Sequence, residues 1–128
     1  MSQVVKTYKD LKFWQTSKKT SIFVVQLIRK LPNERIAWII SDQVLRSVFS
    51  IGANIAEGFG KYKGKEYPRY LQMALGSARE TEYWLELIAE IYPQFADEIG
   101  KILELNSQSV KMVITTINSL RNGDKDKR

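Results

Sequence analysis

Apolar residues recur at intervals of three and four along four stretches of this chain, and polar residues fill the positions between them. This spacing is typical of amphipathic α-helices. It predicts helices over about 8–30, 34–58, 66–92 and 95–120, whereas no stretch alternates with a period of two. The pattern therefore indicates an all-α protein.

The positions expected to face a shared core follow from the same spacing. In the first two helices they are Leu11, Trp14, Ile22, Val25, Ile28, Ala37, Ile40, Val44, Val48, Ile51 and Ile55. In the last two they are Tyr70, Leu71, Ala74, Leu75, Ala78, Leu85, Ile88, Phe95, Ile99, Ile102, Val113, Ile117 and Leu120. Asn106 and Ser109 interrupt the last stripe with polar atoms.

Prolines, glycines and one asparagine predict the helix boundaries. Pro32 disfavours helical geometry at the residue before it, and Asn33 is a candidate N-cap for the second helix. Glycines at 58 and 60 are suited to a left-handed cap at its end. Pro68 fits only the first turn of a helix that begins close to Glu66.

Short connections between long helices make consecutive helices antiparallel neighbours. We therefore expect an up-down-up-down four-helix bundle that occupies 1–120 as one domain. The basic tail, 121–128, has no apolar anchor and is expected to be disordered.

The composition excludes several kinds of chemistry. The 128 residues include neither Cys nor His, which removes thiolate nucleophiles, imidazole bases and most zinc sites. We predict no metal site, no cofactor and no catalytic residue. The first residues do not resemble a signal peptide, and no run of about 18 apolar residues is present. A cytoplasmic location is therefore expected.

Small and polar residues cluster in the middle of the chain. Ser50, Gly52 and Ala53 allow a neighbouring helix to come close, and tight packing within the chain is the favoured reading over a functional groove. Two polar pairs, Asn54 with Glu57 and Ser77 with Glu80, are each spaced by three. If α-helices 34–58 and 66–92 pack antiparallel around a link centred near residue 63, the two pairs lie at similar depths along the bundle, although the match is imperfect. We interpret these four residues as structural hydrogen-bonding groups rather than as an acid/base pair.

The link between the second and third helices carries cations beside aromatic residues. Lys61, Lys63, Lys65 and Arg69 alternate with Phe59, Tyr62, Tyr67 and Tyr70. Lysine neutralises phosphate and aromatic rings stack on unpaired bases, so the link suits single-stranded RNA or DNA. It equally suits an ordinary solvated loop. The formal net charge of +6 favours polyanions without deciding between the two.

Three tryptophans are candidates for a subunit interface. Trp14, Trp38 and Trp84, together with Phe49, are more large aromatic surface than one slim bundle readily buries. We therefore expect a homo-oligomer. The alternative is that these rings fill the core.

The central motifs resemble the 23S ribosomal RNA intervening-sequence protein family. The resemblance rests on QVLRS at 43–47, SIGAN at 50–54, EG at 57–58 and ETEYWL at 80–85. It covers about 11–87 by motif and extends to Leu120 by pattern. It implies a bacterial, cytoplasmic bundle that forms a homo-oligomeric ring, commonly a pentamer, without enzymatic activity. Related bundles are accessory subunits of reverse transcriptases in diversity-generating retroelements, where a basic surface engages RNA and the polymerase.

Two functions remain open from the sequence. The first is an RNA-binding or ribonucleoprotein accessory bundle, with assistance to a reverse transcriptase as one form of that role. The second is a structural protein–protein interaction module that binds no nucleic acid. An enzyme that uses Glu57 and Glu80 is the least favoured interpretation.

Overall fold

A computed structural model of the chain describes residues 4–60 and 66–126. Four α-helices account for most of these residues: α1 (Lys12–Ile28), α2 (Arg35–Phe59), α3 (Glu66–Ile91) and α4 (Ala96–Asp126). Two short 3₁₀ turns, η1 (Tyr8–Asp10) and η2 (Pro93–Phe95), precede α1 and α4, and the described residues contain no strand. The predicted all-α four-helix bundle is confirmed.

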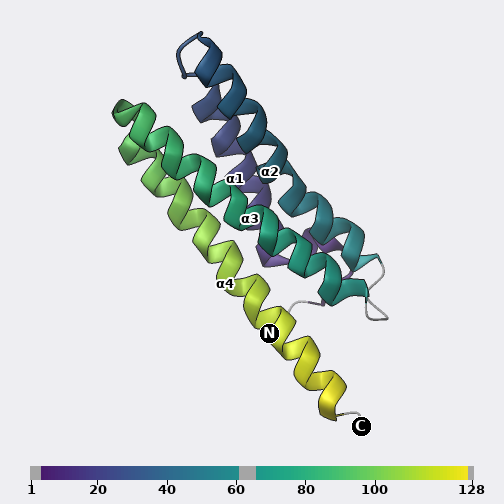
Figure 1. Ribbon diagram of the computed structural model, residues 1–128. Coiled ribbons are helices and arrows are strands. Elements are labelled where there is room, and N and C mark those ends of the chain that lie inside the picture. The colour runs from purple at the N-terminus through teal and green to yellow at the C-terminus, as the bar shows by residue number, and fades with distance from the viewer. Residues whose placement is uncertain (1–3, 61–65, 127–128) are drawn as a thin grey trace.

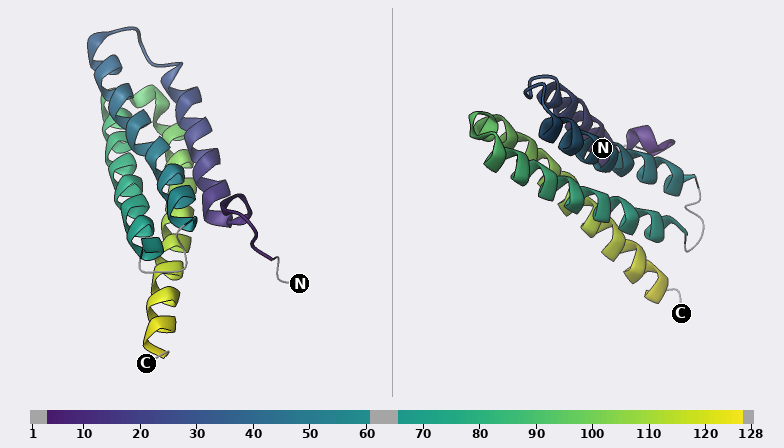
Figure 2. Two further views of the ribbon diagram at one scale, coloured as in Figure 1. Left: turned by 90° about the vertical axis from the view of Figure 1, so that its right-hand side faces the viewer. Right: turned by 45° about the horizontal axis from the view of Figure 1, so that its top comes forward.

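The helices form a closed cycle of neighbours. Each of α1 and α3 packs against both α2 and α4, and the contact between α2 and α3 is the most extensive. Figure 1 and the two views in Figure 2 show consecutive helices running in opposite directions. The end of α2, the start of α3, the start of α1 and the end of α4 consequently lie at one end of the bundle, which we call the link end.

One core runs along the bundle axis. Its fully buried side chains come from all four helices and are almost entirely branched aliphatic residues: Val24, Leu27, Val44, Val48, Ile51, Ile55, Leu71, Leu85, Ile88 and Ile99. Every position expected to be buried on α2 is buried. On α4, Asn106 and Ser109 are buried within the apolar stripe, as their spacing predicts.

The expected stripe on α1 is correct only in part. Leu11, Trp14 and Ile28 pack partly buried against the core, but Ile22 is 48% exposed. The fully buried positions of this helix are Phe13, Ser17, Thr20, Val24 and Leu27. The reason is that both faces of α1 carry apolar residues, and the face that packs inward includes two hydroxyl side chains. Both buried hydroxyl groups form hydrogen bonds within α1. Thr20 donates to the carbonyl oxygen of Thr16 at 2.9 Å, and Ser17 donates to the carbonyl oxygen of Trp14 at 2.7 Å.

The predicted first helix is two elements rather than one. The backbone is extended at Leu11, between η1 and α1. A capping box holds η1: Thr7 Oγ1 accepts from the backbone N–H of Lys9, and the Asp10 carboxylate accepts from the N–H groups of Lys6 and Thr7. These N–H donors lower the pKa of Asp10.

Two predicted caps and one predicted helix end also differ. Asn33 does not cap α2, because the N-cap is Glu34 and the Asn33 side chain instead accepts from the indole N–H of Trp38 at 2.9 Å. Gly60 ends α2 with φ −65°, a right-handed conformation. Helix α4 continues beyond Leu120 as far as Asp126, through most of the tail that was expected to be disordered. No proline interrupts this segment, and α4 projects past the other helices at the link end (Figure 1).

Candidate functional site: the outer faces and the link end

A ladder of hydroxyl groups joins α2 to α3. Ser50 Oγ donates to Ser77 Oγ at 2.7 Å, and the hydroxyl oxygens of Ser47 and Thr81 lie 2.9 Å apart within the core. Asn54 takes no part across the helices, since its side chain donates to the carbonyl oxygen of Ser50 on the same helix at 2.8 Å. The ladder therefore aligns the two helices and does not form an open site.

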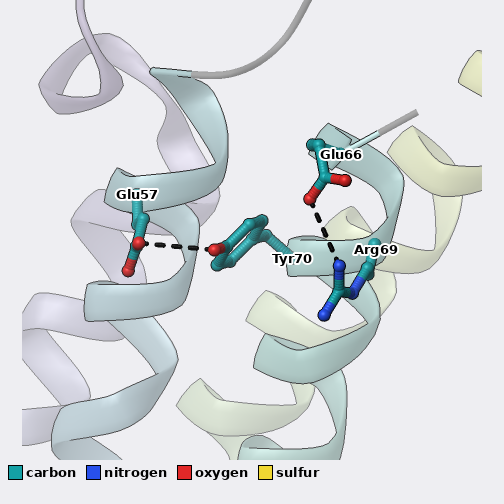
Figure 3. Close-up of polar contacts among 4 residues, drawn as sticks. All are labelled: Glu57, Glu66, Arg69 and Tyr70. Carbon is teal, nitrogen blue, oxygen red and sulfur yellow. Dashed lines mark hydrogen bonds and ion pairs between the residues drawn. The ribbon is translucent and has the colours of Figure 1, made fainter. Parts of the chain in front are cut away.

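Glu57 and Glu80 do not come together. Glu57 accepts a hydrogen bond from the hydroxyl of Tyr70 at 3.3 Å (Figure 3), which places Tyr70 level with Glu57. Glu80 is exposed and lies ten residues farther along α3, about 15 Å at the rise of an α-helix. The approach of the two carboxylates that the sequence allowed is therefore absent, and with it the geometry of a paired acid catalyst.

Small residues let the helices approach within the chain. A Cβ added at Gly52 would lie 3.2 Å from Ser17 Oγ and 3.5 Å from Trp14 Nε1 on α1. A Cβ added at Gly58 would lie 2.4 Å from the Cβ of Tyr70 on α3, which is closer than any real contact. Both glycines therefore pack against neighbouring helices of the same chain.

Only part of the basic link lies within the described residues. Lys61, Lys63 and Lys65 fall outside them. Arg69, on the first turns of α3, is exposed and pairs with the carboxylate of Glu66 at 3.4 Å (Figure 3). A pair this open to solvent is weak, so the guanidinium remains available to a stronger anionic partner.

Charge is distributed unevenly along the bundle. The passages 1–12, 57–69 and 121–128, whose described parts lie at the link end, contain eleven Lys and Arg but only five Asp and Glu. The rest of the chain contains nine of each. The formal net charge of +6 therefore belongs entirely to these three passages.

The outer surface of α1 and α2 is unusually apolar. Trp38 is 57% exposed and Phe49 is 50% exposed, and Leu45 lies partly exposed between them. Two open hollows run along this surface, one lined by Leu45 and Trp38 and the other by Phe49 and Trp14. We call the surface formed by Trp14, Lys18, Trp38, Leu45, Phe49 and Ala53 the α1/α2 face.

The three tryptophans do not share one surface. Trp14 stands edge-on to Tyr8 with ring centroids 5.0 Å apart and lies under the ammonium group of Lys18 at 5.6 Å. The indole N–H of Trp38 donates a hydrogen bond to the side chain of Asn33, and this bond anchors the ring. Trp84 belongs to α3, where it stands edge-on to Tyr83, and its Nε1 is buried without a hydrogen-bond partner among the described residues. Only the first two lie on the α1/α2 face.

Helix α4 presents a different outer surface. None of the exposed large apolar residues in the described part of the chain belongs to α4; they lie on α1, α2, α3 and the N-terminal segment. The outward positions of α4 include Glu104, Ser107, Gln108, Lys111 and Thr115. This helix therefore carries an ordinary solvated face, in contrast to the apolar α1/α2 face.

The first three helices and most of α4 fall within the match to one protein family. The model of the 23S rRNA-intervening sequence protein family matches residues 9–115 and leaves out the first eight residues and the last turns of α4. The chain belongs to this family. The sequence resemblance carried by the central motifs is thereby confirmed.

A solved structure of a relative supports the assignment of the chain to the 23S rRNA-intervening sequence family. It is a protein of unknown function from the S23 ribosomal protein family of Bacteroides thetaiotaomicron VPI-5482, 32% identical to this chain, with a TM-score of 0.73. The similarity covers 82% of this chain and 97% of the relative. No curated protein matches the chain significantly.

Two other kinds of site are absent from the described part of this family member. Within residues 4–60 and 66–126, no group of three or more Asp and Glu side chains is arranged to hold a metal ion. Among the same residues, none of the helices combines the length and apolarity that crossing a bilayer requires. The outer faces and the link end remain as the candidate functional surfaces.

Two features of these surfaces did not follow from the sequence. The sequence paired Asn54 and Glu57 with Ser77 and Glu80, whereas the observed partners across the helices are Ser50 for Ser77 and Tyr70 for Glu57. The basic residues of the link also gave no sign that they share one end of the bundle with other basic passages. The excess of Lys and Arg in these passages can be counted from the sequence, but only the fold shows that the passages lie at one end of the bundle.

Proposed function

We propose that this 23S rRNA-intervening sequence family protein is a non-enzymatic scaffold that self-associates through its α1/α2 face. The observation that carries the proposal is the exposure of Trp38 and Phe49 on one side of the bundle. Contiguous exposed apolar surface of this kind marks interaction sites in soluble proteins, and aromatic rings are enriched at the centres of such interfaces.

The proposed association has a clear driving force. Burying apolar area stabilises a complex by about 25 cal/mol per Å², and a buried aromatic side chain removes on the order of 150 to 250 Å² from water. The ring of Trp38 is already held by the hydrogen bond from its indole N–H to the side chain of Asn33. Little side-chain entropy of Trp38 is therefore lost when a second copy covers it.

Multi-angle light scattering across a concentration series tests the scaffold. We expect the natural chain to exceed monomer mass at micromolar concentration and the double variant Trp38→Gln, Phe49→Gln to shift to monomer. Phe23→Gln is the matched control, because Phe23 is an exposed aromatic residue of α1 beside α4. Far-UV circular dichroism confirms that each variant is folded. A natural chain that stays monomeric overturns the proposal.

We propose nucleic acid, single-stranded RNA in particular, as the ligand of the link end. The supporting observation is the concentration of the whole net charge in three passages whose described parts lie at that end. Phosphate groups bound by Lys and Arg release counterions, so affinity for RNA falls as salt rises. The resemblance also makes a reverse transcriptase that engages the same RNA a candidate protein partner, and co-purification of the two tests it.

A salt series with an RNA oligonucleotide tests this ligand. Replacing Lys61, Lys63, Lys65 and Arg69 with Gln should lower the affinity about tenfold or more and reduce the slope of log affinity against log salt by about 0.7 for each phosphate that is no longer bound. The control replaces four cations outside the link end, namely Lys19, Arg79, Lys101 and Lys111, and so removes the same charge. Equal decreases in affinity for the two variants would contradict the link end as the binding site, and no binding at low salt would support the interaction module without nucleic acid.

A further inference from the structure

The projecting end of α4 carries an asparagine followed directly by a glycine. Asn122 and Gly123 lie in the last turns of this helix, which ends at Asp126. Leu120 is the last apolar side chain of α4 and packs against the core, and beyond it the helix extends past the other three (Figures 1 and 2). Asn122 is exposed, and open space lies where a Cβ of Gly123 would point. Neighbouring helices therefore do not hold this pair in place.

The helical state of this end depends on its own residues. Asn122, Gly123 and Asp124 follow one another, and asparagine, aspartate and glycine are among the weakest helix formers. Glycine also has the most backbone freedom to regain when a helical turn opens. Helices in proteins owe most of their stability to packing against other elements, and unpacked helix ends fray. We therefore expect the last turns of α4 to open more often than its packed turns.

An asparagine beside a glycine reacts with its own backbone when the chain opens. The backbone nitrogen of Gly123 attacks the side-chain carbonyl carbon of Asn122, and the amide nitrogen of that side chain leaves as ammonia. The new carbon–nitrogen bond closes a succinimide ring. Water then opens the ring at either of its carbonyl groups and leaves aspartate or isoaspartate, so no reactant other than water is needed. Glycine favours the attack because it has no Cβ beside the nitrogen.

The other four asparagines lack this combination. None of them precedes a glycine. The side chains of three are engaged in hydrogen bonds, namely Asn33, Asn54 and Asn106. Asn118 is exposed on α4, but it follows Ile117, whose buried side chain holds that turn in the bundle. Asn118 is therefore the matched comparison for Asn122 on the same helix.

We propose that Asn122 is a site of spontaneous deamidation that alters the link end of the protein. The product carries a carboxylate in place of the amide, which lowers the formal net charge of the chain from +6 to +5. Isoaspartate also adds a methylene group to the main chain, so a regular helix does not continue through it. The modification requires neither self-association nor a bound ligand, and it goes beyond the proposed function.

Peptide mapping of the aged protein tests the site directly. The natural chain is kept in mildly alkaline buffer and digested at intervals with trypsin, which cleaves after Lys111, Arg121 and Lys125 and so separates 112–121 from 122–125. Mass spectrometry and chromatography distinguish asparagine, aspartate and isoaspartate. Asn122 should convert severalfold faster than Asn118, and Gly123→Ala should slow its conversion severalfold by adding a Cβ beside the attacking nitrogen. Equal rates at the two asparagines, or a rate at Asn122 that ignores Gly123→Ala, overturn the inference.

The same measurement in concentrated urea separates the role of the structure from that of the dipeptide. Because the end of α4 opens within the folded protein, unfolding should change the rate at Asn122 little. Unfolding should raise the rate at Asn118 severalfold, since it releases the turn that Ile117 holds in the core. A rise at Asn122 as large as that at Asn118 would show that the folded helix keeps the pair closed, and it would overturn the inference.

Discussion

Ser50 on α2 donates a hydrogen bond to Ser77 on α3 at 2.7 Å, across the most extensive helix contact in the bundle. The two residues lie almost equally far from the middle of the link, so the pair records how α2 and α3 are aligned. The heights of the charges and aromatic rings along these two helices follow from this alignment. The polar ladder therefore determines which residues lie level with one another on the outer faces.

The buried hydroxyl groups should respond to alanine in opposite directions. Ser47 and Thr81 contact each other in the core, so Ser47→Ala should lower the free energy of unfolding by about 1 kcal/mol. Ser109 is equally buried but its hydroxyl has no partner among the described residues, so Ser109→Ala should leave stability unchanged or raise it by up to about 1 kcal/mol. Urea unfolding of both variants measures the difference. Equal destabilisation would show that Ser109 is also hydrogen-bonded.

Two helical glycines should also behave differently. A methyl group at Gly58 meets the Cβ of Tyr70, so Gly58→Ala should destabilise the protein by about 1 to 3 kcal/mol by pushing α2 from α3. Gly76 is also helical but has open space around it, so Gly76→Ala should stabilise the protein by about 0.5 to 1 kcal/mol. Thermal unfolding compares them. A neutral Gly58→Ala would contradict the close approach of the two helices.

Stability should fall in strongly alkaline solution. The Tyr92 hydroxyl hydrogen-bonds to the carboxylate of Glu34, and this bond raises the pKa of Tyr92 to about 12. Burial raises the pKa of Tyr67 to about 12 as well. The folded state favours the protonated phenols, so their contribution is complete below the ordinary pKa of about 10 and is lost as pH rises through about 12.

Tyr92→Phe isolates one part of this alkaline loss. The variant should lose less stability than the natural chain between about pH 10 and 12, and Glu34→Gln should act similarly because it removes the charge that faces the phenol. Guanidinium unfolding at several pH values measures both. Identical pH profiles for the natural chain and Tyr92→Phe would contradict the role of this hydrogen bond.

The accuracy of the sequence predictions differed between helices for a physical reason. Every core position expected on α2 is buried, because its aliphatic residues recur at intervals of three and four along most of the helix, although Ile36, Trp38, Ile39 and Phe49 on other sides of it are exposed. Helix α1 has apolar residues all round, with Val24 buried and Ile22 exposed, and its inward side includes Ser17 and Thr20. Periodicity alone does not choose between two apolar faces, so Ile22 was expected in the core and the buried Val24 and Leu27 were missed.

The outer faces were predictable only in part. The excess of large aromatic rings was visible in the sequence, but the sequence did not show which of them are exposed. Trp38 and Phe49 are exposed, whereas Trp14 and Trp84 pack partly buried against the core. The separation of Trp84 from Trp14 depends on which side of each helix faces out, and this follows only from the packed structure. Small offsets along antiparallel helices also changed which polar side chains met across α2 and α3.

The mass of the protein in solution tests the central claim most directly. Light scattering at micromolar concentration should show a mass above that of the monomer for the natural chain and for Phe23→Gln, and monomer mass for the folded variant with Trp38→Gln and Phe49→Gln. A natural chain of monomer mass, or an assembly that survives the loss of both exposed aromatic rings, would contradict the account.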